Sequence, residues 1–154
     1  MSKAPIKTIR ELAKKESESK ELVRSAQRQS DLGEVFTPTP LVIEMLRKLP
    51  AGKKGVWKED KTFLDPACGN GQFLAVILII KLQFGHDPEK ALSTIYGVDI
   101  MADNVKECRE RLWKIAVGEI ENRSFKRRCL NIVKKNIVKA DGLKYDYSFG
   151  EKER

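Results

Sequence analysis

Apolar residues recur at helical spacing in the first thirty residues of the chain, around residues 6–13 and 22–26. Lysine and glutamate fill most of the positions between them, so the pattern predicts one or two amphipathic helices. Their basic side chains could follow a phosphate backbone, although a solvated helix face explains the same pattern. These side chains are Lys7, Arg10, Lys14, Lys15, Arg24 and Arg28.

Three short apolar runs later in the chain are predicted to be β-strands. They cover residues 61–64, 94–98 and 137–140, and we expect the first to be buried. Helical patterns separate the runs, which predicts a parallel α/β sheet with right-handed crossovers. An aspartate directly follows each run. The three aspartates are Asp65, Asp99 and Asp141.

The segment between the first two strands is apolar on nearly every side over residues 72–84. Such a pattern is typical of a helix packed against a sheet. The run 73–80 could also be a strand, but the glycine-rich loop before it and the length of the segment favour a helix. A short helix is predicted to follow at residues 88–93.

Two further helices begin at recognisable N-cap patterns. Thr39 followed by Pro40 predicts a helix start with the threonine as cap. Asp103 is predicted to cap the helix after the second strand. The segment 119–135 is basic and irregular in pattern, and we expect it to be only partly helical.

The composition fits one globular domain with an N-terminal extension. The chain has 154 residues, of which 41% are hydrophobic and 34% charged. We divide it into a basic helical segment at 1–31 and a main domain at 32–154. The formal net charge of +8 favours a polyanionic partner such as DNA, although a merely soluble basic protein is the alternative.

The cysteines and the apolar runs suggest a cytoplasmic protein. Three cysteines match neither a disulfide framework nor a zinc motif, which favours a reducing compartment. The charged N-terminus does not look like a signal peptide, and the longest apolar run is too short to cross a bilayer. His86 lies in a turn-like string, so we expect it in a surface loop.

The turn at residues 65–71 carries the clearest chemical signal. Gly69 and Gly71 allow a tight turn and a close approach to a ligand, and the free amides of the following helix suit a carboxylate. A dinucleotide motif fails because Leu74 stands where the third glycine would be. Asp65 would repel a pyrophosphate but attract an ammonium. A ligand with both an amino group and a carboxylate fits better, such as the methionine end of S-adenosylmethionine.

The other two aspartates fit the nucleoside part of such a ligand. Parallel strands present their carboxyl ends at one edge, where ligands bind. Asp99 could accept hydrogen bonds from both ribose hydroxyls, and Asp141 could accept one from an exocyclic amine. Either aspartate alone could be an ordinary helix cap or turn former.

Four segments resemble the cofactor motifs of amino-methylating DNA methyltransferases. Residues 63–74 (Phe-Leu-Asp-Pro-Ala-Cys-Gly-Asn-Gly-Gln-Phe-Leu) resemble the first motif. Residues 96–100 (Tyr-Gly-Val-Asp-Ile) and 139–143 (Lys-Ala-Asp-Gly-Leu) resemble the second and third. Residues 33–38 (Gly-Glu-Val-Phe-Thr-Pro) resemble the segment that precedes these motifs in the subgroup whose cofactor region lies ahead of the catalytic motif. The resemblance covers roughly 32–145 and points to N6-adenine transfer on a Rossmann-like fold.

The resemblance implies a place for the methionine end of the cofactor. Thr37 would contact its carboxylate, and Asp65 would lie near its amine. Ala67, Gly69 and Gly71 would line the pocket.

It also implies a place for the nucleoside. Asp99 would accept from the ribose hydroxyls, Ile100 would pack on the adenine, and Asp141 would accept from the adenine amine.

Two features of the family are missing from the sequence. The catalytic string, Asp or Asn followed by Pro-Pro and an aromatic residue, does not occur, although the base flipped from the duplex needs such a site. Only about three of the seven family strands are found, so we expect a partial Rossmann-like fold. The first strand would be left at an edge, and the helix after it would lack part of its cover. Self-association, a second polypeptide or a rearranged N-terminal helix could protect that surface.

Two functions are therefore open. The chain could be the cofactor-binding part of a DNA adenine-N6 methyltransferase, with the catalytic motif supplied elsewhere. It could instead be an inactive binding module that sequesters the cofactor or regulates a partner methyltransferase or restriction system. A cofactor-degrading enzyme is a third idea, but no residue set argues for it.

Overall fold

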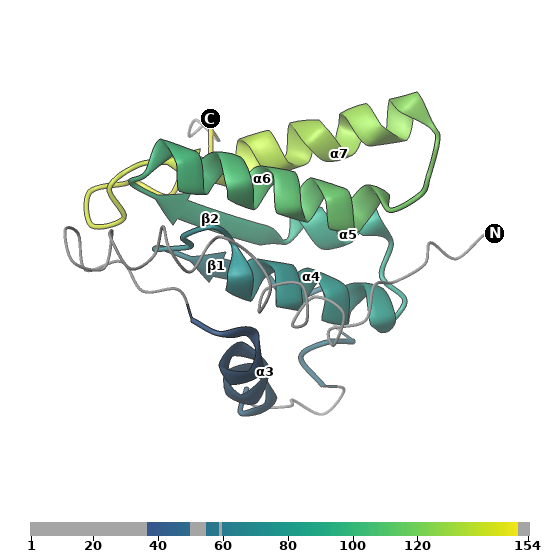
Figure 1. Ribbon diagram of the computed structural model, residues 1–154, viewed down its shortest axis with the longest axis horizontal. Coiled ribbons are helices and arrows are strands. Elements are labelled where there is room, and N and C mark those ends of the chain that lie inside the picture. The colour runs from purple at the N-terminus through teal and green to yellow at the C-terminus, as the bar shows by residue number, and fades with distance from the viewer. Residues whose placement is uncertain (1–36, 50–54, 59, 151–154) are drawn as a thin grey trace.

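Helices alternate with three short strands along the chain (Figure 1). The computed structural model describes residues 37–49, 55–58 and 60–150. The predicted N-terminal helices of residues 1–31 lie outside these ranges. The elements in chain order are α3 (Thr39–Arg47), β1 (Phe63–Asp65), α4 (Gln72–Gln83), α5 (Pro88–Ser93), β2 (Ile95–Asp99), α6 (Ala102–Val117), α7 (Arg123–Asn136) and β3 (Ile137–Lys139).

The strands form a parallel sheet in the order β1-β2-β3. Asp65 pairs with Gly97, and Asp99 pairs with Lys139, so the three strands end at a common edge. The predicted α/β class and parallel sheet are thus confirmed, with three strands flanked by helices. Because β1 has only β2 beside it in the described part of the chain, its Leu64 is 47% exposed. The expectation that the first strand is buried was wrong.

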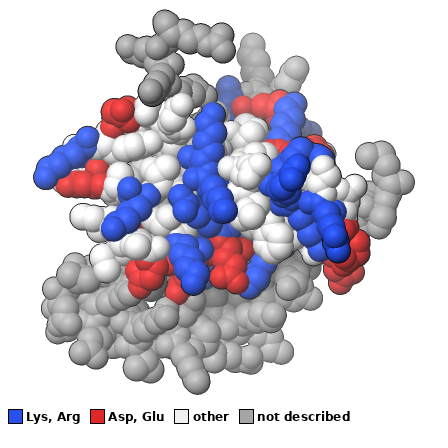
Figure 2. All heavy atoms as spheres, turned by 90° about the horizontal axis from the view of Figure 1, so that it is seen from above, with Lys and Arg blue, Asp and Glu red and all other residues white. Residues whose placement is uncertain are grey.

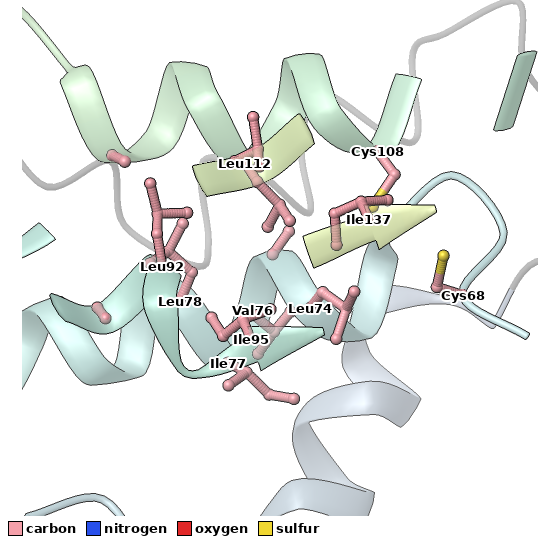
Figure 3. Close-up of a cluster of buried hydrophobic side chains, with 14 of the residues drawn as sticks. Cys68, Leu74, Val76, Ile77, Leu78, Leu92, Ile95, Cys108, Leu112 and Ile137 are labelled. Atoms are coloured by element: carbon pink, nitrogen blue, oxygen red, sulfur yellow. The ribbon is translucent and has the colours of Figure 1, made fainter. Parts of the chain in front are cut away.

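The core is built around α4, whose residues Leu74 to Ile79 are all buried. The helix packs against α3, α6 and β2, with Val42 and Leu46 of α3 covering one side. Figure 3 shows the buried side chains that α5, α6, β2 and β3 add to the same cluster. A helix that is apolar all round is stable only when it is surrounded. The expectation that α4 lacks part of its cover was therefore wrong, because α3 supplies it.

Two predicted N-caps were wrong. The N-cap residue of α3 is Pro38 rather than Thr39, and that of α6 is Met101 rather than Asp103; neither helix has a side-chain cap. Helix α6 begins at Ala102, so Asp103 already lies inside its first turn. Asp99, at the end of β2, accepts the hydrogen bond from the backbone N–H of Met101 at 2.8 Å.

The basic segment after α6 is more regular than predicted. Most of it forms α7, a helix of 14 residues. Asn122 caps this helix by accepting a hydrogen bond from the N–H of Phe125 at 2.9 Å. Cys129 and Val133 bury the inner side of the helix against α5 and α6. The packing of its apolar side against neighbouring helices therefore stabilises α7, although many of its positions are charged.

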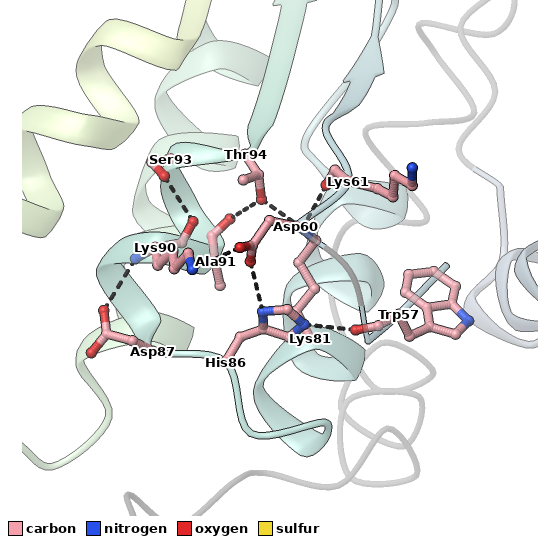
Figure 4. A network of polar contacts seen from close by, with 10 residues as sticks. All are labelled: Trp57, Asp60, Lys61, Lys81, His86, Asp87, Lys90, Ala91, Ser93 and Thr94. Atoms are coloured by element: carbon pink, nitrogen blue, oxygen red, sulfur yellow. Dashed lines mark hydrogen bonds and ion pairs between the residues drawn. The ribbon is translucent and has the colours of Figure 1, made fainter. Parts of the chain in front are cut away.

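A polar network stabilises the amino end of the sheet (Figure 4). The ammonium of the fully buried Lys81 donates to the carbonyl of Lys61 at 2.7 Å and to Oγ1 of Thr94 at 2.6 Å. These bonds connect α4 to the segments that lead into β1 and β2. Burial lowers the pKa of Lys81 below its ordinary value.

His86 extends this network and is not the exposed loop residue that we expected. Its side chain is only 10% exposed, with Nδ1 lying 3.3 Å from a carboxylate oxygen of Asp60. Its Nε2 lies 2.6 Å from the carbonyl of Trp57. The ring joins two loops, which explains its burial.

The face of the sheet that carries Tyr96 is covered by an aromatic segment after β3. The ring of Phe149 lies 4.7 Å from that of Tyr96, and Tyr145 packs edge-on against Phe149 at 5.3 Å. Both Phe149 and Tyr147 have positive φ values, which cost free energy in non-glycine residues. The aromatic contacts offset this cost. No helix in the described ranges combines the length and apolarity needed to span a membrane.

We predict that Lys81→Ala lowers the free energy of unfolding by about 2–4 kcal/mol, since it removes a buried stem and leaves polar partners unpaired. Chemical denaturation followed by circular dichroism measures the change. The matched control is Lys90→Ala, which removes an exposed lysine paired with Asp60 in the same network and should cost less than about 1 kcal/mol. Equal losses in the two variants would contradict the structural role of Lys81.

Candidate functional site

The glycine-rich loop between β1 and α4 is fixed at the carboxyl end of the sheet. The N–H of Cys68 donates to the carbonyl of Val98 in β2 at 2.9 Å. Gly71 has a φ of +88°, and a Cβ at this position would lie 2.6 Å from Sγ of Cys108 on α6. Only glycine tolerates both the conformation and the close approach. The predicted tight turn is thus present, and it packs directly on α6.

The carboxylate of Asp99 joins this loop to the end of β2 and the start of α6. One oxygen accepts from the N–H of Gly69 at 2.9 Å. The other accepts from the N–H of Met101 at 2.8 Å and from the side-chain amide of Asn104 at 3.3 Å. The sequence pointed to Asp99 and Gly69, and the structure brings them into direct contact. The sequence did not point to Met101 or Asn104 as partners of Asp99, because neither residue type is typical of a carboxylate-binding site.

Asp65 ends β1 beside the same loop. Its carboxylate accepts a hydrogen bond from the N–H of Ala67 at 3.1 Å. Burial raises the pKa of Asp65 above its ordinary value, and the negative charge of Asp99 raises it further, against the opposing effect of the Ala67 hydrogen bond. Two carboxylates that repel each other in this way favour the binding of a cation between or beside them.

Asp141 lies in the turn that follows β3. Its carboxylate accepts from the N–H of Leu143 at 2.9 Å and lies 3.6 Å from the ammonium of Lys144. Backbone contacts connect this turn to the end of β2 and to the glycine-rich loop. The N–H of Ala140 donates to the carbonyl of Asp99 at 3.0 Å, and a Cβ on Gly142 would clash with the carbonyl oxygen of Pro66. The three strand ends therefore converge on the glycine-rich loop, although Asp141 uses its own carboxylate to shape its turn.

The two remaining predicted residues differ in their settings. Ile100 is 62% exposed directly after β2, which leaves an apolar side chain at the edge for a ligand to cover. Thr37 is half-buried, two residues before α3. Among the residues that the structure describes, no hydrogen bond connects Thr37 to the glycine-rich loop.

The site has the polar groups that an amino-acid ligand requires. No side chain caps the N-terminus of α4, so its first amides are available to an anion. Oδ1 of Asn70, in the same loop, is buried without a hydrogen-bond partner in the described structure. An orphaned acceptor of this kind costs about 1–3 kcal/mol unless a donor reaches it. Together with Asp65 and Asp99, these groups fit a zwitterion attached to a nucleoside.

Burial makes the thiols of the described segments poor candidates for a nucleophile. Cys68, Cys108 and Cys129 are free and buried. The neighbouring Cys108 and burial raise the pKa of the Cys68 thiol well above its ordinary value, which disfavours the thiolate that a nucleophile needs. No cluster of three or more potential metal ligands occurs in this part of the chain.

A cavity of about 310 Å³ lies elsewhere, between α6 and α7. Lys106, Arg109, Trp113, Leu130 and Lys134 line it. It contains none of the predicted site residues. We assign the candidate site to the open carboxyl edge of the sheet, because the convergent acids and free amides lie there.

The comparison with known protein families agrees with this geometry. A family model described as N-6 DNA Methylase matches residues 22–146. The match spans all three strands and the loops that follow them. Searches of curated proteins and of solved structures give no match. Because the family model covers most of the chain, including every described element of the candidate site, the chain belongs to the N-6 DNA methylase family.

Proposed function

We propose that this chain binds S-adenosylmethionine and forms the cofactor-binding part of a DNA adenine-N6 methyltransferase. The observation that carries the proposal is the hydrogen bond between the Asp99 carboxylate and the N–H of Gly69. It joins an acidic strand end to an open helix N-terminus. A ligand that joins a ribose to an amino acid needs both groups close together: a carboxylate for the ribose hydroxyls and free amides for the amino-acid carboxylate.

The methionine end is assigned to the first loop. Asp65 attracts the ammonium, and the free amides at the start of α4 attract the carboxylate. Ala67 is exposed and Gly69 is half-buried, so both can contact the ligand. Gly71 allows the turn to pack against α6. Thr37 is proposed as a further contact to the carboxylate.

The nucleoside is assigned to the second and third strand ends. A carboxylate has about four lone-pair sites, and Asp99 uses three of them for Gly69, Met101 and Asn104. The ribose hydroxyls would take the remaining site or replace one of these donors. Ile100 would cover one face of the adenine, and Asp141 would accept from its amine. When bound, the cofactor supplies the sulfonium methyl group that is transferred.

Methyl transfer needs a base-binding motif that this sequence does not contain. The six prolines are never adjacent, so the Pro-Pro-aromatic string is absent. We propose that another polypeptide segment supplies it and packs along the free edge of β1, where Leu64 is 47% exposed. DNA is the proposed substrate, since the net charge of +8 suits a polyanion.

An inactive binding module remains the second candidate, and the same missing motif favours it. It would hold the cofactor without transferring the methyl group, and would act on a partner methyltransferase or restriction system.

Ile100→Ala is predicted to weaken cofactor binding without destabilising the fold. The side chain is exposed, so the free energy of unfolding should change by less than about 0.5 kcal/mol. Loss of its contact with adenine should reduce affinity about five- to tenfold in calorimetry with S-adenosylmethionine. Leu143→Ala is the matched control, because Leu143 is 97% exposed and lies outside the proposed adenine contact. Equal affinity in parent and Ile100→Ala would remove Ile100 from the site.

Cofactor affinity is predicted to rise with pH across the acidic range and then become constant. A bound ammonium favours the ionised form of Asp65, so a proton must leave before binding. Because burial raises the pKa of Asp65, this step falls above the ordinary pKa of an aspartate. Calorimetry across this range measures it. Asp65→Asn should bind more weakly and lose the dependence, and an unchanged pH profile in that variant would refute the assignment.

A methyl-transfer assay on adenine-containing DNA separates the two candidates. We expect no transfer by this chain alone, because it lacks a base-binding motif. Transfer should appear when a partner that carries the Pro-Pro-aromatic motif is added. Transfer by the chain alone would contradict the proposal, and continued absence with every methyltransferase partner would favour the binding module.

A further inference from the structure

Helix α7 has an unusually one-sided charge. Its 14 residues include six basic side chains and no acidic one. Arg123, Arg127 and Lys134 are all exposed. At 3.6 residues per turn, these three positions fall within about 40° of one another around the helix axis. We call these three residues the α7 basic face.

The α7 basic face is not neutralised by its surroundings. Other basic residues of the helix have acidic neighbours: Arg128 pairs with Glu89 at 2.7 Å, and Lys126 lies 3.6 Å from Glu121. Within the described structure, no acidic side chain pairs with Arg123, Arg127 or Lys134. The buried residue Cys129 lies about 140° around the helix axis from the centre of this face, at 100° per residue.

The charge continues from α7 onto the neighbouring helix. Lys106 of α6 and Lys134 of α7 line opposite sides of the cavity between the two helices. The one acid in the lining, Glu110, already pairs with Lys114 at 2.6 Å. Figure 2 looks onto this layer, where lysine and arginine side chains cross the middle and right of the face while acidic side chains lie mostly near its margins.

This surface suits a polyanion better than a protein partner. Protein interfaces depend on apolar anchors at their centre. The large hydrophobic side chains that are strongly exposed in the described structure belong to other elements, and none lies on α6 or α7. Trp113 and Leu130 between these helices are half-buried. Unpaired cations without an apolar anchor are the pattern expected of phosphate contacts.

We infer that the α7 basic face, with Lys106, binds the phosphate backbone of duplex DNA. Arg123 and Lys134 lie eleven residues apart, which is about 16 Å along a helix. One strand of a duplex carries one phosphate per about 3.4 Å of its axis, so a helix lying along one strand spans about five phosphates over this length. Such contacts position the protein and carry no sequence preference. The inference rests on the proposed function only for the choice of DNA as the polyanion.

The test is fluorescence anisotropy with a labelled duplex of arbitrary sequence, measured over a series of salt concentrations. The variant is Arg123→Gln/Arg127→Gln/Lys134→Gln. The matched control, Lys48→Gln/Lys58→Gln/Lys61→Gln, removes the same charge from exposed lysines before β1. The slope of log affinity against log salt should fall by about 0.9 for each lost contact in the first variant. It should change little in the control.

Equal losses in the two variants, or no binding of the duplex by the parent chain at low salt, would overturn the inference and leave α7 as a solvated helix face. Calorimetry with S-adenosylmethionine on the α7 variant keeps this result separate from the cofactor proposal, since its affinity should equal that of the parent. If the parent fails to bind the cofactor but loses DNA affinity through the α7 substitutions, the cofactor proposal fails and the DNA surface remains.

Discussion

The arrangement at the carboxyl edge of the sheet depends on one side chain, the carboxylate of Asp99. It accepts hydrogen bonds from the glycine-rich loop through Gly69, from the start of α6 through Met101, and from the side chain of Asn104. Its backbone carbonyl accepts from Ala140, which leads out of β3. Charge-assisted hydrogen bonds of this kind are stronger than neutral ones. A single residue therefore connects all three strand-end segments.

The two ends of the sheet are organised differently. At the amino end, the buried ammonium of Lys81 and the ring of His86 connect loops to one another, and their polar atoms have partners. At the carboxyl end, the α4 amides are uncapped, Oδ1 of Asn70 has no partner in the described structure, and Ile100 is exposed. The unpaired polar atom and the uncapped amides of the described structure therefore lie at the carboxyl end. This division is what a ligand site on a rigid scaffold requires.

Much of this could be predicted from local sequence, and two of the departures from it have a tertiary cause. Alternating strands and helices, the apolar helix α4 and the glycine turn all follow from patterns within a few residues. The N-caps at Thr39 and Asp103 were wrong, the segment before β3 is more regular than expected, and His86 lies in a loop as expected but is largely buried. For α7 a packed neighbouring helix, and for His86 a residue far away in the chain, outweighed the local preference. Asp99 takes the Met101 amide, and Asp60 lies beside the His86 ring.

The sequence by itself determined where the glycine-rich turn lies and that an aspartate ends or follows each strand, because both are local patterns. Only the tertiary structure decided that they meet, since the contact between Asp99 and Gly69 joins residues thirty positions apart. It also decided that α3 covers α4 and that the cations of α7 lie together on one exposed face. These outcomes depend on which surfaces are buried against each other, and burial is a property of the whole fold.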